Sequence, residues 1–136
     1  MDEIIAKTEL LYQKSKPIDQ LSLKDAINLI VNEQKNAARD VRKAAKSIEC
    51  AINKVVDHLT LYKKGRLIYV GAGTSGRIGI QDGVELFPTF NWPKNRLDYI
   101  IAVGNSAILT AVENAEDNII LAKDIVIEKK INYQDV

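Results

Sequence analysis

The sequence predicts an α/β fold, in which a parallel sheet carries helices on both faces and follows a helical lead-in. Two short β-favouring runs, residues 66–70 and 97–103, each lead to a glycine and then to a segment with helical spacing. This strand-helix-strand-helix order is typical of parallel strands joined by right-handed crossovers. At 136 residues, the chain is long enough for one domain with a core. We therefore expect one integrated domain, with the lead-in over 1–62 and the α/β part over 63–136.

The lead-in is expected to become helical at Ser22. Ser22 followed by Asp25 is typical of a helix N-terminus, and Pro17 predicts irregular structure before it. Apolar residues then recur three and four positions apart, which predicts one apolar stripe on a helix or a pair of helices. The stripe consists of Leu23, Ile27, Ile30, Val31, Ala37, Ala38, Val41, Ala45, Ile48, Ile52, Val55, Val56 and Leu59. One straight helix would reach roughly 55 Å, too long for this domain, so we expect a break at 32–36.

In the α/β part we expect helices over 76–86, 105–114 and 117–130, after and between the two strands. The first of these helices should end before Phe87, because a residue that precedes proline is disfavoured in the α region. Two strands cover their helices poorly, and a third strand is expected to begin at 133–136. The sequence therefore resembles a truncated parallel domain.

Composition and charge exclude several classes of partner. Apolar residues make up 46% of the chain, and 19 basic against 18 acidic residues leave a net charge of +1. This balance predicts neither a nucleic-acid nor a membrane-surface partner, and no apolar run approaches the roughly 18 residues of a membrane span. The acidic N-terminus lacks the pattern of a secretory signal. One cysteine, Cys50, and one histidine give no zinc-type ligand set. We expect a cytoplasmic protein without a metal, in which Cys50 is buried.

The loop after the first strand, residues 71–77, carries the pattern Gly-x-Gly-x-x-Gly. Its glycines let the backbone approach an anion, and the helix that follows presents free N–H groups. We interpret the loop as a site for one phosphate monoester, formed by Gly73, Thr74, Ser75, Gly76 and Arg77. A dinucleotide is rejected, because the second strand ends without the acidic residue that would hold a ribose. The alternative is a tight strand-to-helix turn capped by a hydroxyl group.

Two carboxylates, Glu85 and Glu116, follow the first and second strand-helix pairs. In a parallel α/β domain these segments can return near the carboxyl edge of the sheet, where ligands bind. Two carboxylates in one partly apolar pocket can hold different pKa values, so that one acts as a base and the other as an acid. The alternative is that both are solvated surface charges.

These motifs resemble those of the bacterial N-acetylmuramic acid 6-phosphate etherases, members of the sugar isomerase (SIS) fold group. The resemblance rests on GRLIYVGAGTSGRIG at 65–79, AVENAED at 111–117 and PTF at 88–90, and it spans almost the whole chain. It implies an SIS-like, Rossmann-like three-layer domain that corresponds to the N-terminal half of the family. The family's third strand and serine-rich phosphate loop would begin just after Val136.

The resemblance also implies a reaction. The family's lyases cleave the lactyl ether of N-acetylmuramic acid 6-phosphate by elimination and add water, which gives N-acetylglucosamine 6-phosphate and D-lactate in cell-wall recycling. Glu116 aligns with the base that removes the C2 proton, and Glu85 aligns with the acid that protonates lactate and later activates water. Residues 74–76 align with the phosphate-side loop. No organic cofactor is implied.

The sequence departs from the family pattern near Glu85, where GVELF at 83–87 replaces the family's Ala-Ser-Glu-Cys-Pro. Tyr12 and Val103 also replace residues that are usual in the family. The chain is thus predicted to be a fragment, a shortened product that needs a partner, or a degenerate relative of the etherases. Alternatives to the lyase are a non-catalytic sugar-phosphate-binding or regulatory module, a packing unit without a ligand, and an aldose-ketose isomerase. The expected partners are a phosphorylated amino sugar and either a second copy or a chain that supplies the missing half, because the apolar stripe exceeds what two strands can cover.

Overall fold

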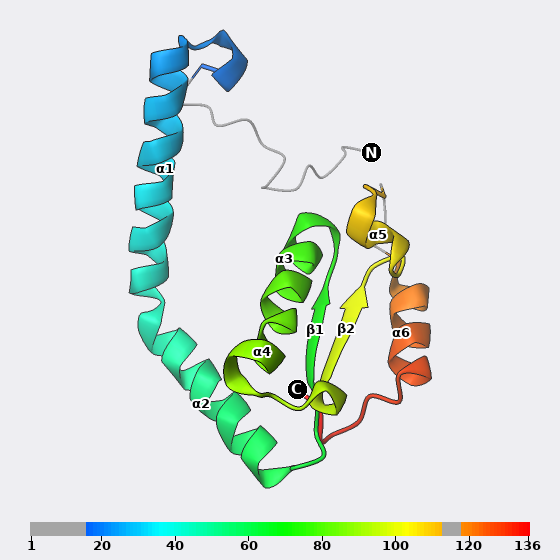
Figure 1. The fold of residues 1–136 in the computed structure, drawn as a ribbon. Coiled ribbons are helices and arrows are strands. Elements are labelled where there is room, and N and C mark those ends of the chain that lie inside the picture. Colours follow the sequence, from blue (N-terminus) through cyan, green and yellow to red (C-terminus); the bar gives the residue numbers. More distant parts are fainter. Residues whose placement is uncertain (1–15, 113–117) are drawn as a thin grey trace, which may run out of the picture. The chain divides into compact units, whose positions relative to one another are not determined.

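The computed structural model describes residues 16–112 and 118–136 of the chain. These residues fall into two compact units, one ending at Ile48 and the other running from Glu49 to Val136. The elements, labelled in Figure 1 where there is room, are η2 (Ile18–Gln20), α1 (Leu23–Lys43), α2 (Ala45–Leu61), β1 (Leu67–Gly71), α3 (Gly73–Val84), α4 (Leu86–Phe90), η3 (Lys94–Arg96), β2 (Leu97–Ile101), α5 (Ser106–Leu109) and α6 (Ile119–Glu128).

The first unit is dominated by α1, and its start confirms the predicted cap. The Ser22 hydroxyl accepts the backbone N–H of Asp25 at 3.2 Å and donates to the Asp25 carboxylate at 2.6 Å. This arrangement satisfies one of the N–H groups that a helix leaves unpaired at its N-terminus.

The break in the helical lead-in lies at Ala44, and the predicted break at 32–36 is wrong. Ala44 closes α1, and its N–H is shared between the carbonyl oxygens of Asp40 at 3.3 Å and Val41 at 3.0 Å. Residues 32–36 contain neither glycine nor proline, so the helix continues through them.

The second unit is built on two parallel strands, as the sequence predicts. Leu67 of β1 lies opposite Leu97 of β2, and the register continues to Gly71 opposite Ile101. Just beyond the strands, the N–H of Ala102 donates to the Gly71 carbonyl at 2.9 Å. The two carboxyl ends therefore lie side by side, and any loops that follow them share one edge of the sheet.

Helices cover both faces of this sheet, which agrees with the predicted α/β fold (Figure 1). On one face α3 packs closely, because a Cβ added at Gly83 would approach the Tyr99 ring to 2.6 Å. The rings of Tyr99 and Tyr69 stack beneath α3, with centroids 6.0 Å apart. On the other face, α6 and the side chains of Val70 and Ile100 line an apolar crevice.

Several predicted ends shift in the structure. The helix expected at 76–86 begins at Gly73 and ends at Val84, and Pro88 lies in the first turn of the separate helix α4. Proline is tolerated there because N–H groups of a first turn have no intrahelical acceptor. The helix expected at 105–114 is observed as the four residues of α5. The expectation of a buried Cys50 is wrong, because this thiol is exposed.

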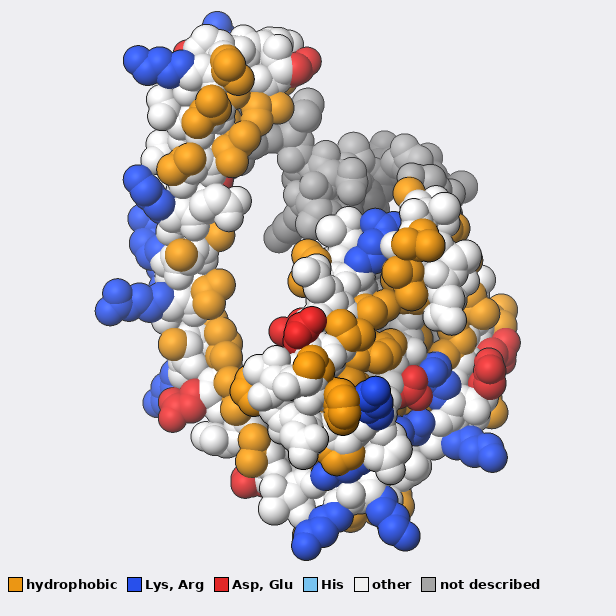
Figure 2. Space-filling view, viewed as in Figure 1, with side chains coloured by type: hydrophobic (Ala, Val, Ile, Leu, Met, Phe, Trp, Pro, Cys, Tyr) orange, Lys and Arg blue, Asp and Glu red, His pale blue; other side chains and the backbone are white. Residues whose placement is uncertain are grey.

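No helix in the described part of the chain is both long enough and apolar enough to cross a membrane. Large apolar side chains are exposed in both units, as the space-filling view in Figure 2 shows. The buried apolar core in the described residues is small and consists of Leu59, Ile101 and Ala107.

Candidate functional site

The glycine loop is shaped by backbone contacts that exclude side chains. A Cβ added at Gly71 would lie 2.8 Å from the Cα of Gly76, and one added at Gly76 would lie 3.0 Å from the carbonyl carbon of Gly71. Glycine at both positions therefore lets the first turn of α3 sit directly on the end of β1. Between them, Gly73 takes a φ of +51° and begins α3, a left-handed conformation that glycine adopts without steric cost.

The first backbone donors of α3 are available to a ligand. The first hydrogen bond of the helix runs from the Gly76 N–H to the Ala72 carbonyl at 3.0 Å. The N–H groups of Gly73, Thr74 and Ser75 precede that bond, and within the described residues they have no acceptor. The side chains of Thr74 and Ser75 are exposed and make no hydrogen bond to described residues. One helix start thus carries three N–H groups without a described acceptor and two exposed hydroxyl side chains, an arrangement that suits an anion.

Arg77 connects this loop to the segment that follows β2. Its Nε donates to the carbonyl of Ala107 at 2.9 Å, and its Nη2 donates to the carbonyl of Thr110 at 3.1 Å. Ala107 lies within α5 and Thr110 directly follows it, so two of the guanidinium's donors hold the two segments together. A role of Arg77 in binding phosphate stays a prediction beside this structural one.

A second loop reaches the same edge of the sheet. After β2, Val103 and Gly104 take φ values of 69° and 83°, and the Gly104 N–H closes the turn on the Ile101 carbonyl at 2.9 Å. Asn105 and Ser106 follow with exposed side chains. The sequence reasoning did not single out these two polar residues. The signal for them is a polar pair directly after a parallel strand, because ligands of parallel α/β domains bind at the carboxyl edge.

The structure does not bring Glu85 to the glycine loop. Glu85 follows the last residue of α3, and the twelve residues of this helix span roughly 18 Å at 1.5 Å per residue. From the glycine loop α3 runs back along the sheet, and its end lies toward the amino ends of the strands (Figure 1). The exposed Glu85 directly follows that end, contrary to the expectation that it returns to the carboxyl edge. Glu116 lies outside the described residues. Of the predicted site residues, the structure therefore gathers Gly73, Thr74, Ser75 and Gly76 in one place.

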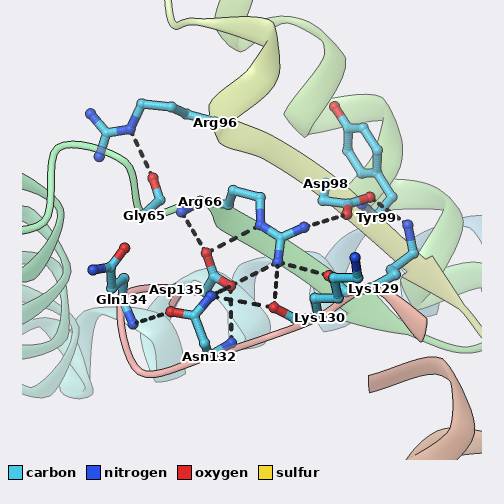
Figure 3. Close-up of polar contacts among 10 residues, drawn as sticks. All are labelled: Gly65, Arg66, Arg96, Asp98, Tyr99, Lys129, Lys130, Asn132, Gln134 and Asp135. Carbon is cyan, nitrogen blue, oxygen red and sulfur yellow. Dashed lines mark hydrogen bonds and ion pairs between the residues drawn. The ribbon is translucent and has the colours of Figure 1, made fainter. Parts of the chain in front are cut away.

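A separate charged cluster lies at the amino end of the sheet (Figure 3). Arg66 forms ion pairs with Asp135 at 2.8 Å and with Asp98 at 3.2 Å, and Lys129 pairs with Asp98 at 2.6 Å. The hydrogen bond from Arg66, which outweighs the effect of burial, lowers the pKa of Asp135 to about 2. This cluster lies at the opposite end of β1 from the glycine loop.

Parallel strands with helices on both faces, and a glycine loop at the carboxyl end of the first strand, define an α/β domain of the SIS class. The chain belongs to this family: the family model described as the glucokinase regulatory protein N-terminal SIS domain matches residues 43–135.

Among curated proteins, the chain is similar to several etherases. It is 39% identical over 128 residues to N-acetylmuramic acid 6-phosphate etherase 2 of Lactiplantibacillus plantarum, a match that covers 94% of this chain and 43% of that relative. The N-acetylmuramic acid 6-phosphate etherase of Clostridioides difficile is 41% identical over 129 residues, covering 95% and 42%. That of Psychromonas ingrahamii is 46% identical over 112 residues, covering 82% and 37%. The chain thus spans less than half the length of these relatives.

Proposed function

We propose that this chain binds the phosphate of an amino-sugar 6-phosphate at the glycine loop and forms part of an etherase-type lyase. The observation that supports this most directly is the set of N–H groups at 73–75, which lack an acceptor in the described residues and stand beside the exposed hydroxyls of Thr74 and Ser75. A phosphate monoester matches such donors in charge and geometry. The names of the three similar etherases support N-acetylmuramic acid 6-phosphate as the substrate.

In the proposed reaction, the sugar opens to its aldehyde, which acidifies the proton on C2. Glu116 removes that proton, the electron pair forms the C2–C3 double bond, and the C3–O bond to lactate breaks. Glu85 gives the departing lactate its proton and then activates the water that adds back. Phosphate binding at the loop supplies orientation for C2 and C3, because binding energy remote from the reacting atoms can position them. The proposal needs neither a metal nor an organic cofactor.

Binding is tested by calorimetry with N-acetylmuramic acid 6-phosphate and, separately, with inorganic phosphate. Replacing both hydroxyls, as Thr74→Val with Ser75→Ala, should weaken sugar-phosphate binding more than about tenfold, since hydrogen bonds to charged groups contribute about 1.5–3 kcal/mol each. Ser47→Ala, which removes an exposed hydroxyl from α2, is the matched control and should bind normally. Equal affinity of the double variant and the control would contradict the proposed site.

Catalysis is tested by lactate release and by exchange of the C2 proton in deuterated water. Glu116→Gln should abolish exchange, whereas Glu85→Gln should block lactate release and retain exchange, because the acid acts after the C2 proton has left. A Glu116→Gln protein that exchanges the proton at the normal rate would remove Glu116 from its role.

The second candidate function is a non-catalytic sugar-phosphate-binding or regulatory module. The observation that favours it is the position of Glu85, roughly 18 Å along α3 from the glycine loop. The family model supports it as well, since its description names a regulatory protein. Binding without lactate formation at high protein concentration would favour this function over the lyase.

We further propose that the protein is cytoplasmic and that it self-associates or pairs with a chain that supplies further SIS elements. Self-association is supported by the exposed stripe on α1, where Ile27 and Val41 are 52% and 61% exposed. Apolar surface of this kind is a common interface. Sedimentation at high concentration should show a dimer, and a strictly monomeric profile would exclude self-association.

A further inference from the structure

The turn that follows β2, residues 102–106, is held beside the glycine loop and is called the β2 turn below. The Ala102 N–H donates to the Gly71 carbonyl at 2.9 Å, so the turn leaves the sheet one strand spacing, about 4.8 Å, from the loop. On the helix side, Arg77 of α3 donates to the Ala107 carbonyl of α5 at 2.9 Å. The two loops therefore belong to one surface at the carboxyl edge, and bonds on both sides fix their spacing.

The space above both loops is open with respect to the described residues. A Cβ added at Gly73 of the glycine loop or at Gly104 of the β2 turn would meet no described atom within 4 Å. Next to Gly104, the side chain of Asn105 is exposed and makes no hydrogen bond to described residues. Because a hexose phosphate is longer than one strand spacing, a sugar anchored at the start of α3 reaches the β2 turn.

The backbone of the β2 turn gives Asn105 a fixed place. Val103 takes a φ of 69°, and the Gly104 N–H closes the turn on the Ile101 carbonyl at 2.9 Å. A branched residue such as valine rarely adopts this left-handed conformation, and it persists there where the surroundings determine it. The Asn105 carbonyl then accepts the Ile108 N–H at 3.1 Å. The main chain at this position is thus held, while the side chain stays exposed.

The side chain of Asn105 suits an amide better than an anion. A carboxamide carries an N–H donor and a carbonyl acceptor next to each other and bears no charge. The acetamido group of an N-acetylated sugar presents the complementary acceptor and donor. In an amino-sugar 6-phosphate this group is attached to C2, toward the opposite end of the carbon chain from the phosphate. A phosphate at the glycine loop therefore leaves the C2 substituent to a neighbouring loop.

We propose that Asn105 is a specificity residue that recognises the C2 acetamido group of the bound sugar phosphate. Its side chain donates one hydrogen bond to the acetamido carbonyl and accepts one from the acetamido N–H. The site thereby distinguishes an N-acetylated amino sugar from a sugar with a hydroxyl group at C2. This inference rests on the proposed function, because it takes the phosphate to be anchored at the glycine loop.

The test compares three ligands by calorimetry: N-acetylglucosamine 6-phosphate, glucose 6-phosphate, which has a hydroxyl group at C2, and inorganic phosphate. The unsubstituted chain should prefer the N-acetylated sugar to glucose 6-phosphate. Asn105→Ala should weaken binding of the N-acetylated sugar about threefold to tenfold, as expected for hydrogen bonds between uncharged groups, and leave the other two ligands within about twofold. Asn53→Ala, which removes an exposed carboxamide from α2, is the matched control and should leave all three affinities unchanged.

A second measurement needs no substitution and decides the matter if Asn105→Ala unfolds. In nuclear magnetic resonance spectra of the unsubstituted chain, the side-chain NH₂ signals of Asn105 should shift on addition of N-acetylglucosamine 6-phosphate. They should shift much less with glucose 6-phosphate. Signals that respond equally to the two sugars, or to neither, would overturn the proposal.

Equal affinities of the unsubstituted chain for the two sugars would also overturn the proposal. So would an equal loss for both sugars in Asn105→Ala, because Asn105 would then contact a group other than the acetamido. Each of these results leaves the phosphate site at the glycine loop intact. The proposed function fails separately, if none of the three ligands binds or if the chain with both Thr74→Val and Ser75→Ala binds them normally, and the specificity of Asn105 then falls with it.

Discussion

Replacing Asp135 with asparagine should destabilise the second unit at neutral pH and have little effect in acid. Asparagine keeps an oxygen that can accept the Arg66 backbone N–H, but it loses the negative charge that pairs with the guanidinium. The substitution therefore isolates the charge of one nearly buried carboxylate and keeps its shape.

The expected magnitude follows from the pKa of the carboxyl group. The pKa of Asp135 falls from 3.8 to about 2, chiefly through the hydrogen bond from Arg66. At 1.36 kcal/mol for each pKa unit, this difference corresponds to about 2 kcal/mol of folding free energy. Because the pKa is lower in the folded state, the stabilisation is complete above about pH 4 and is lost as the pH falls toward 2.

Urea denaturation followed by circular dichroism, at pH 7 and near pH 2, measures this difference directly. The free energy of unfolding of the variant should be lower by about 2 kcal/mol at pH 7, and the two proteins should converge in acid. Asp57→Asn, at an exposed position on α2, is the control and should match the unsubstituted chain at both pH values. A loss of equal size at both pH values would refute the reasoning, because a purely steric effect of the substitution does not titrate.

Three further outcomes follow from the structure. Gly76→Ala should destabilise the second unit by about 1–3 kcal/mol, because the new methyl group meets the Gly71 backbone at 3.0 Å. Thermal unfolding measures this loss of stability, and unchanged stability would mean that the loop relaxes around the methyl group. Ser22→Ala should cost α1 about 1 kcal/mol through the lost cap, seen as reduced helicity on heating, whereas Ser22→Asp should retain the helix. Burial and a hydrogen bond to Asp82 raise the pKa of Tyr69 to about 12. Ultraviolet titration of the unsubstituted chain should show a tyrosine ionisation near that pH, and the Tyr69→Phe variant should lack it. Loss of an ionisation near pH 10 in the variant would contradict this assignment.

Local chemistry explains why much of the fold could be predicted from the sequence. The cap at Ser22, the strand after residue 66 and the turn at Gly71 depend on residues a few positions apart, and each is found close to its expected place. The break in the lead-in could not be located in this way. Ala44 is itself a strong helix former, so its helix propensity gives no signal for the break at that position.

The candidate site was predictable to the same extent. Glycine spacing reports backbone geometry directly, and the close approach of Gly71 and Gly76 follows from it. That the loop binds phosphate stays a prediction. The direction of Arg77 depends on the carbonyl groups of Ala107 and Thr110, thirty and more positions away, and no local pattern encodes it. The place of Glu85 depends on the length and direction of α3, which carries it away from the carboxyl edge where the sequence led us to expect it.

The direction of α3 also limits which groups can act on a sugar bound at the loop. The span from phosphorus to C2 in an open-chain hexose 6-phosphate is shorter than α3, so a phosphate held at the helix start keeps C2 and C3 near the carboxyl edge of the sheet. Asn105 and Ser106, whose side chains are exposed, follow β2 at that edge, whereas Glu85 follows the far end of α3. If Glu85 is the acid of the proposed lyase, the glutamate that serves this loop belongs to another molecule, because α3 is held against both tyrosine rings of the sheet. If the protein is a lyase, association is then a condition of its chemistry, whereas a binding module needs only the loop.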